Sequence, residues 1–121
     1  MRVLKLLLPI LMVPWLLAAP VRAEQARIAL TFDDLPGLSL FADQPYVDYL
    51  NIMLLRGLKQ HRLPAIGFVN ESKLDLIDRP RQIANLTRWL DAGMALGNHT
   101  FSHESPDQLG AACYVEDIAR G

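Results

Sequence analysis

Apolar positions divide the chain after residue 26 into short and long segments. Short apolar runs at residues 27–32, 65–69 and 94–96 predict three strands, and the first has so little polar alternation that we expect it to be buried on both faces of a sheet. The longer segments between and after them carry apolar residues at helical spacing. Strands that alternate with helices predict βαβ units and a parallel sheet. The predicted fold class is therefore α/β.

Two of the helices have clear start and stop signals. Asp43 and Asp78 are each followed two residues later by proline, which is typical of a helix N-cap. We expect the first helix to end near residues 61–63 and the second to end just before Gly93. The predicted packing faces are Val47, Leu50, Leu54 and Leu58, beside Met53, in the first helix and Ile83, Leu86 and Leu90 in the second.

A capping box predicts where the last helix begins. Ser105 is followed by Pro106 and by Gln108 at the third position, and we expect one helix over residues 107–120. Residues 70–78 are predicted to form a polar connection with room for one helical turn. Cys113 is the single cysteine, so it excludes a disulfide within the chain, and we expect it to be a small buried residue.

The first 23 residues have the pattern of an export signal. Arg2 and Lys5 precede the apolar run of residues 6–18, and Val21 and Ala23 form a small-x-small cleavage pattern. We therefore predict a signal peptide at residues 1–23, a domain at residues 24–121, and a periplasmic or secreted protein. An uncleaved N-terminal anchor is the alternative. After cleavage we expect no stable membrane span, because the run is short and is removed.

Charge excludes one class of partner. Cleavage would leave 9 basic and 13 acidic residues, a formal net charge of about −4. No basic stripe remains, which argues against nucleic acid as a partner.

Titratable residues follow two of the predicted strands. Asp33 and Asp34 end the first, and His99 and His103 follow the third. In parallel α/β folds, ligands bind at the carboxyl edge of the sheet. Histidines four apart can face the same way on a helical turn, and with Asp34 they suit a Zn²⁺-like ion with open positions. Asp33 would then be the base. Successive residues of an extended strand point opposite ways, and the Pro36–Gly37 break would bend the strand end so that both carboxylates reach the same site.

Each of these features has a plainer explanation when it is taken alone. Adjacent aspartates before a Pro-Gly turn are usually a solvated turn, and His-x-x-x-His pairs are common on surface helices. We expect no role for His61 at a helix end, and we expect Trp89 to pack in its helix rather than bind sugar. Glu71, Asp75 and Asp78 are expected to be loop carboxylates.

At these residues the chain resembles a known family. The sequence LTFDD with Pro36, the strand AIGFV and the sequence GNHTFSH resemble the polysaccharide deacetylases, the NodB-homology or carbohydrate esterase family four enzymes, from about residue 27 to residue 121. The resemblance implies a partial (β/α) barrel of the distorted NodB-homology type, made of the first three βα units.

The resemblance also implies an activity and a site. Asp33 matches the general base, and the metal ligands are matched by Asp34, His99 and His103. The implied enzyme is a metal-dependent hydrolase that removes acetyl groups from N-acetylated or O-acetylated polysaccharide. The implied cofactor is a divalent metal, Zn²⁺ with Co²⁺ or Ni²⁺ as alternatives, and the implied partner is an acetylated glycan.

The chain departs from the family in two respects. Leu35 stands where the family most often has glycine, which puts the substrate class in doubt. After His103 the sequence has no match to the later Arg-Pro-Tyr, Asp-Trp and Leu-x-His stretches, the last of which supplies the general acid. We therefore expect the N-terminal portion of a larger domain. Two alternatives are a non-catalytic truncated metal- or glycan-binding remnant and an amidase on a small non-sugar amide.

Overall fold

Three parallel strands form the centre of the computed structural model, which describes residues 27–37 and 43–121. The order in the sheet is β1-β2-β3, so the α/β prediction is confirmed. The predicted signal peptide lies outside the described residues. The strands are β1 (Leu30–Leu35), β2 (Ala65–Val69) and β3 (Ala95–Asn98), and the helices are α1 (Gln44–His61), the 3₁₀ helix η1 (Glu71–Asp75), α2 (Arg79–Asp91), α3 (Pro106–Leu109) and α4 (Ala111–Arg120).

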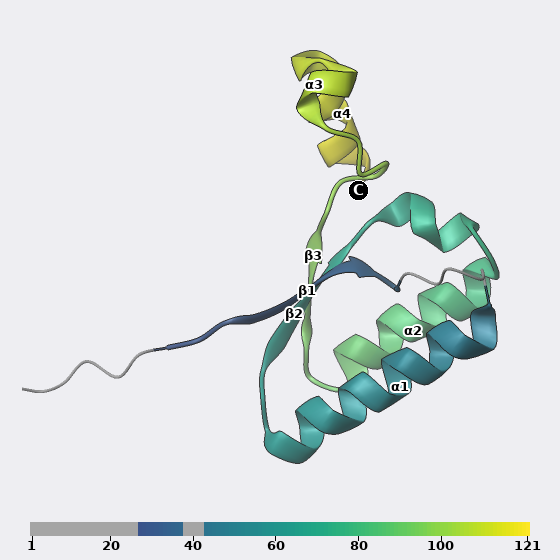
Figure 1. Cartoon of the computed structure of the whole chain (residues 1–121), viewed down its shortest axis with the longest axis vertical. Coiled ribbons are helices and arrows are strands. Elements are labelled where there is room, and N and C mark those ends of the chain that lie inside the picture. The colour runs from purple at the N-terminus through teal and green to yellow at the C-terminus, as the bar shows by residue number, and fades with distance from the viewer. Residues whose placement is uncertain (1–26, 38–42) are drawn as a thin grey trace, which may run out of the picture.

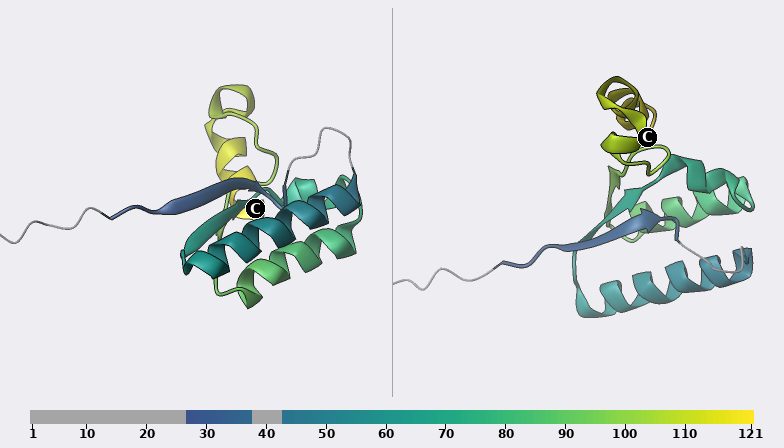
Figure 2. Two further views of the ribbon diagram at one scale, coloured as in Figure 1. Left: turned by 60° about the horizontal axis from the view of Figure 1, so that its bottom comes forward. Right: turned by 45° about the horizontal axis from the view of Figure 1, so that its top comes forward.

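The helices are unevenly distributed around this sheet. Helices α1 and α2 lie side by side on one face, and α3 and α4 extend beyond the carboxyl end of β3 (Figures 1 and 2). Within the part of the chain that is described, no helix has the length and apolar character needed to cross a membrane.

Only one face of the sheet is well covered among the described residues, so the prediction that the first strand is buried on both faces is wrong. In β1, Leu30 and Phe32 are partly buried and pack on the core, whereas Thr31 and Asp33 are exposed. Ile28, predicted to lie in this strand, precedes it and is 87% exposed. The physical reason is that α1 and α2 pack against a single face, which leaves the alternate side chains uncovered.

The packing faces of the two long helices also differ from the prediction. In α2 the buried residues are Gln82, Asn85 and Trp89, while Ile83 and Leu90 are 45% and 56% exposed. In α1, Val47 and Leu58 are buried as predicted, but Leu50 and Met53 are exposed. Trp89 lies in the core, as predicted, and contacts the ring of Phe32 edge-on with centroids 5.6 Å apart.

A polar network between α1 and α2 accounts for this difference. Gln44 Nε2 donates to Gln82 Oε1 at 3.2 Å, and Asn85 Nδ2 donates to Asp48 Oδ1 at 2.7 Å. Arg81 also pairs with Asp48. Because these groups satisfy one another, polar side chains occupy positions that a hydrophobic pattern assigns to solvent.

Most of the predicted helix boundaries are confirmed. The Asp78 carboxylate accepts from Arg81 N at 3.1 Å, and Ser105 and Gln108 form the capping box. Gly93 takes the left-handed conformation after α2, with φ of 80°. The single C-terminal helix is a wrong prediction, because Gly110, with φ of 75°, divides it into α3 and α4. Cys113 on α4 is exposed rather than buried.

Gly67 in β2 is required by close packing. A Cβ at this position would overlap Leu35 Cδ1 and lie 3.3 Å from Trp89 Cε3. We expect Gly67→Ala to lower the free energy of unfolding by about 1–3 kcal/mol, because the core must move to admit the methyl group. Gly57→Ala in α1, where nothing lies within 4 Å, is the control and should stabilise the chain by up to about 1 kcal/mol. Urea unfolding of both variants measures the difference, and equal effects would contradict the packing argument.

Candidate metal centre

Asp34 is placed by an irregular end of β1. The pairing of β1 with β2 shifts register between Phe32 and Leu35, and Asp34 lies there with φ of 66°, in the left-handed region. Gly37 N donates to Asp34 O at 3.0 Å and closes a turn. The predicted bend at the strand end is therefore present, although it lies at Asp34 itself as well as at the Pro36–Gly37 break.

The two histidines lie on a loop that continues from β3. His99 N donates to Val69 O at 2.9 Å, so the loop begins hydrogen-bonded to β2. Thr100 and His103 both have φ of 66°, and Thr100 Oγ1 accepts from His103 N at 3.1 Å. Phe101 and Ser102 between the histidines form bends, so the segment is not the helical turn that the spacing predicted. The two imidazole rings still lie together, with centroids 5.0 Å apart at an angle of 64°.

The structure brings Asp34, His99 and His103 to one place. One ligand atom from each lies within 4.8 Å of the others. Asp34 Oδ1 is 3.5 Å from His103 Nε2 and 3.9 Å from His99 Nε2. Ligand atoms about 2.1 Å from one tetrahedral ion are about 3.4 Å apart, so this donor set fits a possible metal site.

Asp33, the predicted base, lies on the other face of the strand from the core. Its side chain is exposed, and among the described residues it has no hydrogen bond or ion pair. It is adjacent in sequence to a candidate ligand, and its role in catalysis stays a prediction.

Lys73 is a residue of this site that sequence reasoning did not find. It lies on η1, directly after β2, and its Nζ is 2.5 Å from Asp34 Oδ1. Burial raises the pKa of the Asp34 carboxyl, but the Lys73 hydrogen bond and charge, followed by the charges of His103 and His99, lower that pKa below its ordinary value of 3.8. The position of Lys73 after the middle strand was the available signal, because that strand ends at the same sheet edge.

Asn70 joins the end of β1 to the histidine loop. Its side chain is fully buried, and its Nδ2 donates to the carbonyl of His99 and, at 3.3 Å, to that of Thr100. Its backbone N donates to Leu35 O at 3.3 Å. One residue at the end of β2 therefore connects the segments that carry the three candidate ligands.

Helix α4 supports the same loop from the other side. Asp117 is buried, and both of its carboxylate oxygens accept from Ser102 N, at 3.1 and 3.2 Å. Arg120 stacks over the ring of Phe101 at 3.9 Å. Burial raises the pKa of Asp117, but hydrogen bonds from Ser102, Thr100 and Phe101 lower it below the ordinary value of 3.8. The loop is thus held by a carboxylate that is ionised at neutral pH.

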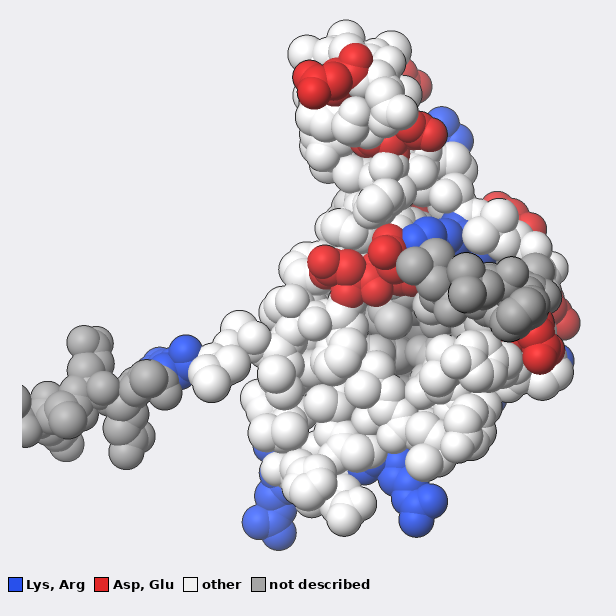
Figure 3. All heavy atoms as spheres, in the orientation of Figure 1, with Lys and Arg blue, Asp and Glu red and all other residues white. Residues whose placement is uncertain are grey.

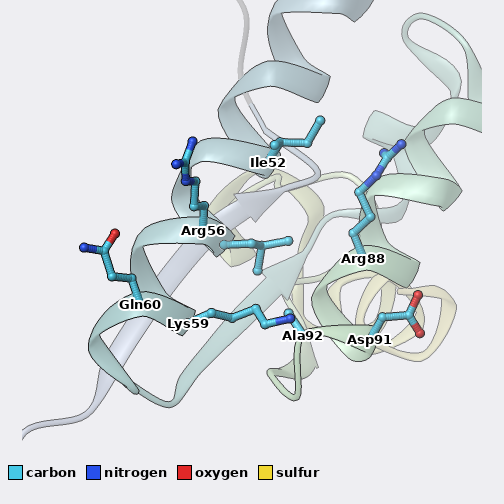
Figure 4. Close-up of a pocket in the computed structure, with 8 residues that line it drawn as sticks. Ile52, Arg56, Lys59, Gln60, Arg88, Asp91 and Ala92 are labelled. Carbon is cyan, nitrogen blue, oxygen red and sulfur yellow. The ribbon is translucent and has the colours of Figure 1, made fainter.

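A groove of about 660 Å³ lies elsewhere, between the C-terminal halves of α1 and α2 (Figure 4). Arg56, Lys59 and Arg88 line it together with one acidic residue, Asp91. The C-terminal end of α1 leads into the start of β2, whereas the candidate ligands follow the strand ends. The groove is therefore at the opposite end of the sheet from the candidate metal centre. Lys and Arg side chains project at that end, and acidic side chains gather beside the end of β1 (Figure 3).

Comparisons with known proteins identify the family. A family model described as polysaccharide deacetylase matches residues 21–121, and the chain belongs to this family. Among solved structures, the chain is similar to the peptidoglycan deacetylase PdaC from Bacillus subtilis, with 27% identity and a TM-score of 0.53. The alignment covers 75% of this chain but 38% of that one, so the chain spans much less than the length of its relative. No curated protein gave a significant match.

These findings bear directly on the expectations from the sequence. The family resemblance and a fold consistent with the first units of a (β/α) barrel are confirmed. Membership of a hydrolase family is also established. The identity of a metal and the roles of the individual residues stay predictions.

We expect Asp117→Asn to loosen the histidine loop, because an amide offers one acceptor oxygen in place of two. Exchange of the Ser102 amide proton, followed by NMR, should become faster, and metal affinity should fall about 10-fold. In the wild type the pKa of Asp117 is lowered by folding. The anchoring is therefore complete above pH 3.8 and is lost as the pH falls through the lower folded pKa.

The neighbouring exposed residue on α4 provides the control for this prediction. Glu116→Gln removes a charge from the same helix without touching the loop, and it should leave Ser102 exchange unchanged. Equal effects of the two substitutions would contradict the anchoring role of Asp117.

Proposed function

We propose that this chain supplies the metal centre and the base of an exported, metal-dependent deacetylase that acts on acetylated polysaccharide. The observation that carries the proposal is the convergence of Asp34, His99 and His103 at the carboxyl edge of the sheet. Family membership and the likeness to a protein described as a peptidoglycan deacetylase support the substrate class. Export is inferred from the sequence of residues 1–23.

The proposed ligands suit Zn²⁺, with Co²⁺ or Ni²⁺ as alternatives, because they combine two imidazoles with one carboxylate. Such an ion, when bound, supplies Lewis acidity toward the acetyl carbonyl and toward water. Asp33 lies beside Asp34 with a solvent-accessible carboxylate and would take the proton from the attacking water. Hydrolysis forms a bond from the water oxygen to the acetyl carbon, breaks the bond from that carbon to nitrogen or oxygen, and delivers a proton to the leaving group.

The source of that last proton separates this function from a second candidate. The sequence contains three histidines: His99 and His103 are candidate ligands, and His61 lies at the C-terminal end of α1. No histidine of this sequence is therefore placed to act as general acid at the metal centre. A chain that binds metal or glycan without turnover is the alternative, and an amidase on a small non-sugar amide is a third reading because Leu35 replaces the usual glycine.

Metal binding tests the centre directly. We expect the full chain to bind one equivalent of zinc, and the double variant His99→Ala, His103→Ala to bind it at least about 100-fold more weakly, because two of three protein ligands are lost. His61→Ala is the matched control and should bind as the wild type does. Zinc content after dialysis and titration against a chromogenic chelator measure this, and equal zinc in the wild type and the double variant would remove the ligand assignment.

Turnover separates the candidate functions. Acetate release would be measured from N-acetylated peptidoglycan, chitin oligomers, acetylxylan and a small acetamide, with the zinc-loaded protein. For a deacetylase, Asp33→Asn should keep zinc binding and lower the rate by about 10²–10⁴-fold, because it removes the base alone. Zinc binding without acetate release from any of these compounds would favour the non-catalytic function.

A further inference from the structure

We propose that Lys73 is an internal cation of the metal centre, which competes with a bound metal for Asp34 and so sets the metal affinity of the site. This inference depends on the proposed metal centre. Lys73 is in this proposal a positioning residue that tunes metal affinity, because it acts on the ligand Asp34 rather than on substrate.

The argument begins with the oxygen that Lys73 contacts. Its Nζ lies 2.5 Å from Asp34 Oδ1. The same oxygen is the one measured at 3.5 Å and 3.9 Å from the Nε2 atoms of His103 and His99. An ion bound to the two imidazoles and to this oxygen would therefore share its carboxylate ligand with an ammonium group.

Two further observations fix Lys73 in this position. Backbone bonds hold η1 against the site, because Ser72 N donates to Phe101 O and Lys73 N donates to Asn70 O, both at 3.1 Å. The acidic neighbours of Lys73 on η1 are also engaged elsewhere. Glu71 and Asp75 both pair with Arg79, at 3.4 and 2.8 Å. Asp34 is consequently the carboxylate that Lys73 contacts among the described residues.

The energetic consequence follows from charge and burial. The side chains of Lys73 and Asp34 are 13% and 25% exposed, so water screens this pair less than a surface pair. Two cations on one oxygen would lie about 4 Å apart, a separation at which like charges repel strongly near a protein surface. Lys73 therefore stabilises the metal-free site by neutralising Asp34, and it weakens the binding of a divalent ion to the same carboxylate.

The test is the zinc affinity of Lys73→Met, a substitution of similar length that removes the charge. We expect this variant to bind zinc at least about 10-fold more tightly than the wild type, because the repulsion is absent. Lys73→Arg keeps the charge and should stay near the wild-type affinity. Lys59→Met, in the groove between α1 and α2, is the control for loss of a lysine and should change nothing. Equal or weaker zinc binding by folded Lys73→Met would overturn the proposal and leave a purely structural ion pair.

A measurement on the wild type keeps the proposal testable if Lys73→Met does not fold. The side-chain ammonium NMR signal of Lys73 should shift when zinc is added, whereas that of Lys59 should not. An unshifted Lys73 signal in a chain that binds zinc would overturn the inference and leave the metal centre intact. Failure of the wild type to bind zinc would instead overturn the proposed metal centre itself.

Discussion

The parallel register of the three strands is the constraint on which the site depends. Val69 pairs with Leu35 on one side and with Asn98 on the other. Asp34 and His99 are therefore neighbours of the same β2 residue, although they are 65 positions apart in the sequence. In an antiparallel sheet of the same strand order, β2 would end at the opposite edge, and Asn70 and Lys73 would lie far from both segments. The candidate ligands thus converge because β1 and β3 run in the same direction on either side of β2.

The polar network of the helix layer extends to the site. Asn51 Nδ2 donates to Pro36 O at 2.7 Å, and Asn51 Oδ1 accepts from Trp89 Nε1 at 2.8 Å. The turn that follows Asp34 is therefore hydrogen-bonded to α1, and α1 is in turn hydrogen-bonded to α2. All of these atoms are buried, so each bond satisfies a group that would be costly to leave unpaired. The position of Asp34 consequently depends on both long helices as well as on the sheet.

Sequence patterns predicted the parts of this structure that depend on local rules. The strand β2, the N-cap at Asp78, the capping box at Ser105 and the glycine after α2 follow from residue preferences that act within a few positions. The meeting of Asp34 with His99 and His103 followed from the rule that parallel strands end at one edge. The same rule places Lys73 and Asn70, which follow β2, at that edge, but their contacts and those of Asp117 could not be predicted, because they depend on distant backbone or side chains. The helix faces were missed for the same reason, since buried Gln82 and Asn85 are satisfied by partners on α1.

The backbone conformation at the candidate ligands has a consequence for evolution and engineering. Asp34, Thr100 and His103 all hold φ of 66°, a region that costs a residue with a side chain about 1–3 kcal/mol and costs glycine little. Glycine would relax the backbone at each position, but at Asp34 it would also leave Lys73 without its carboxylate partner, and at His103 it would delete a candidate ligand. Selection for stability alone would therefore favour glycine at His103 and so remove one ligand of the candidate centre. Stability and metal binding are in this sense opposing requirements at His103.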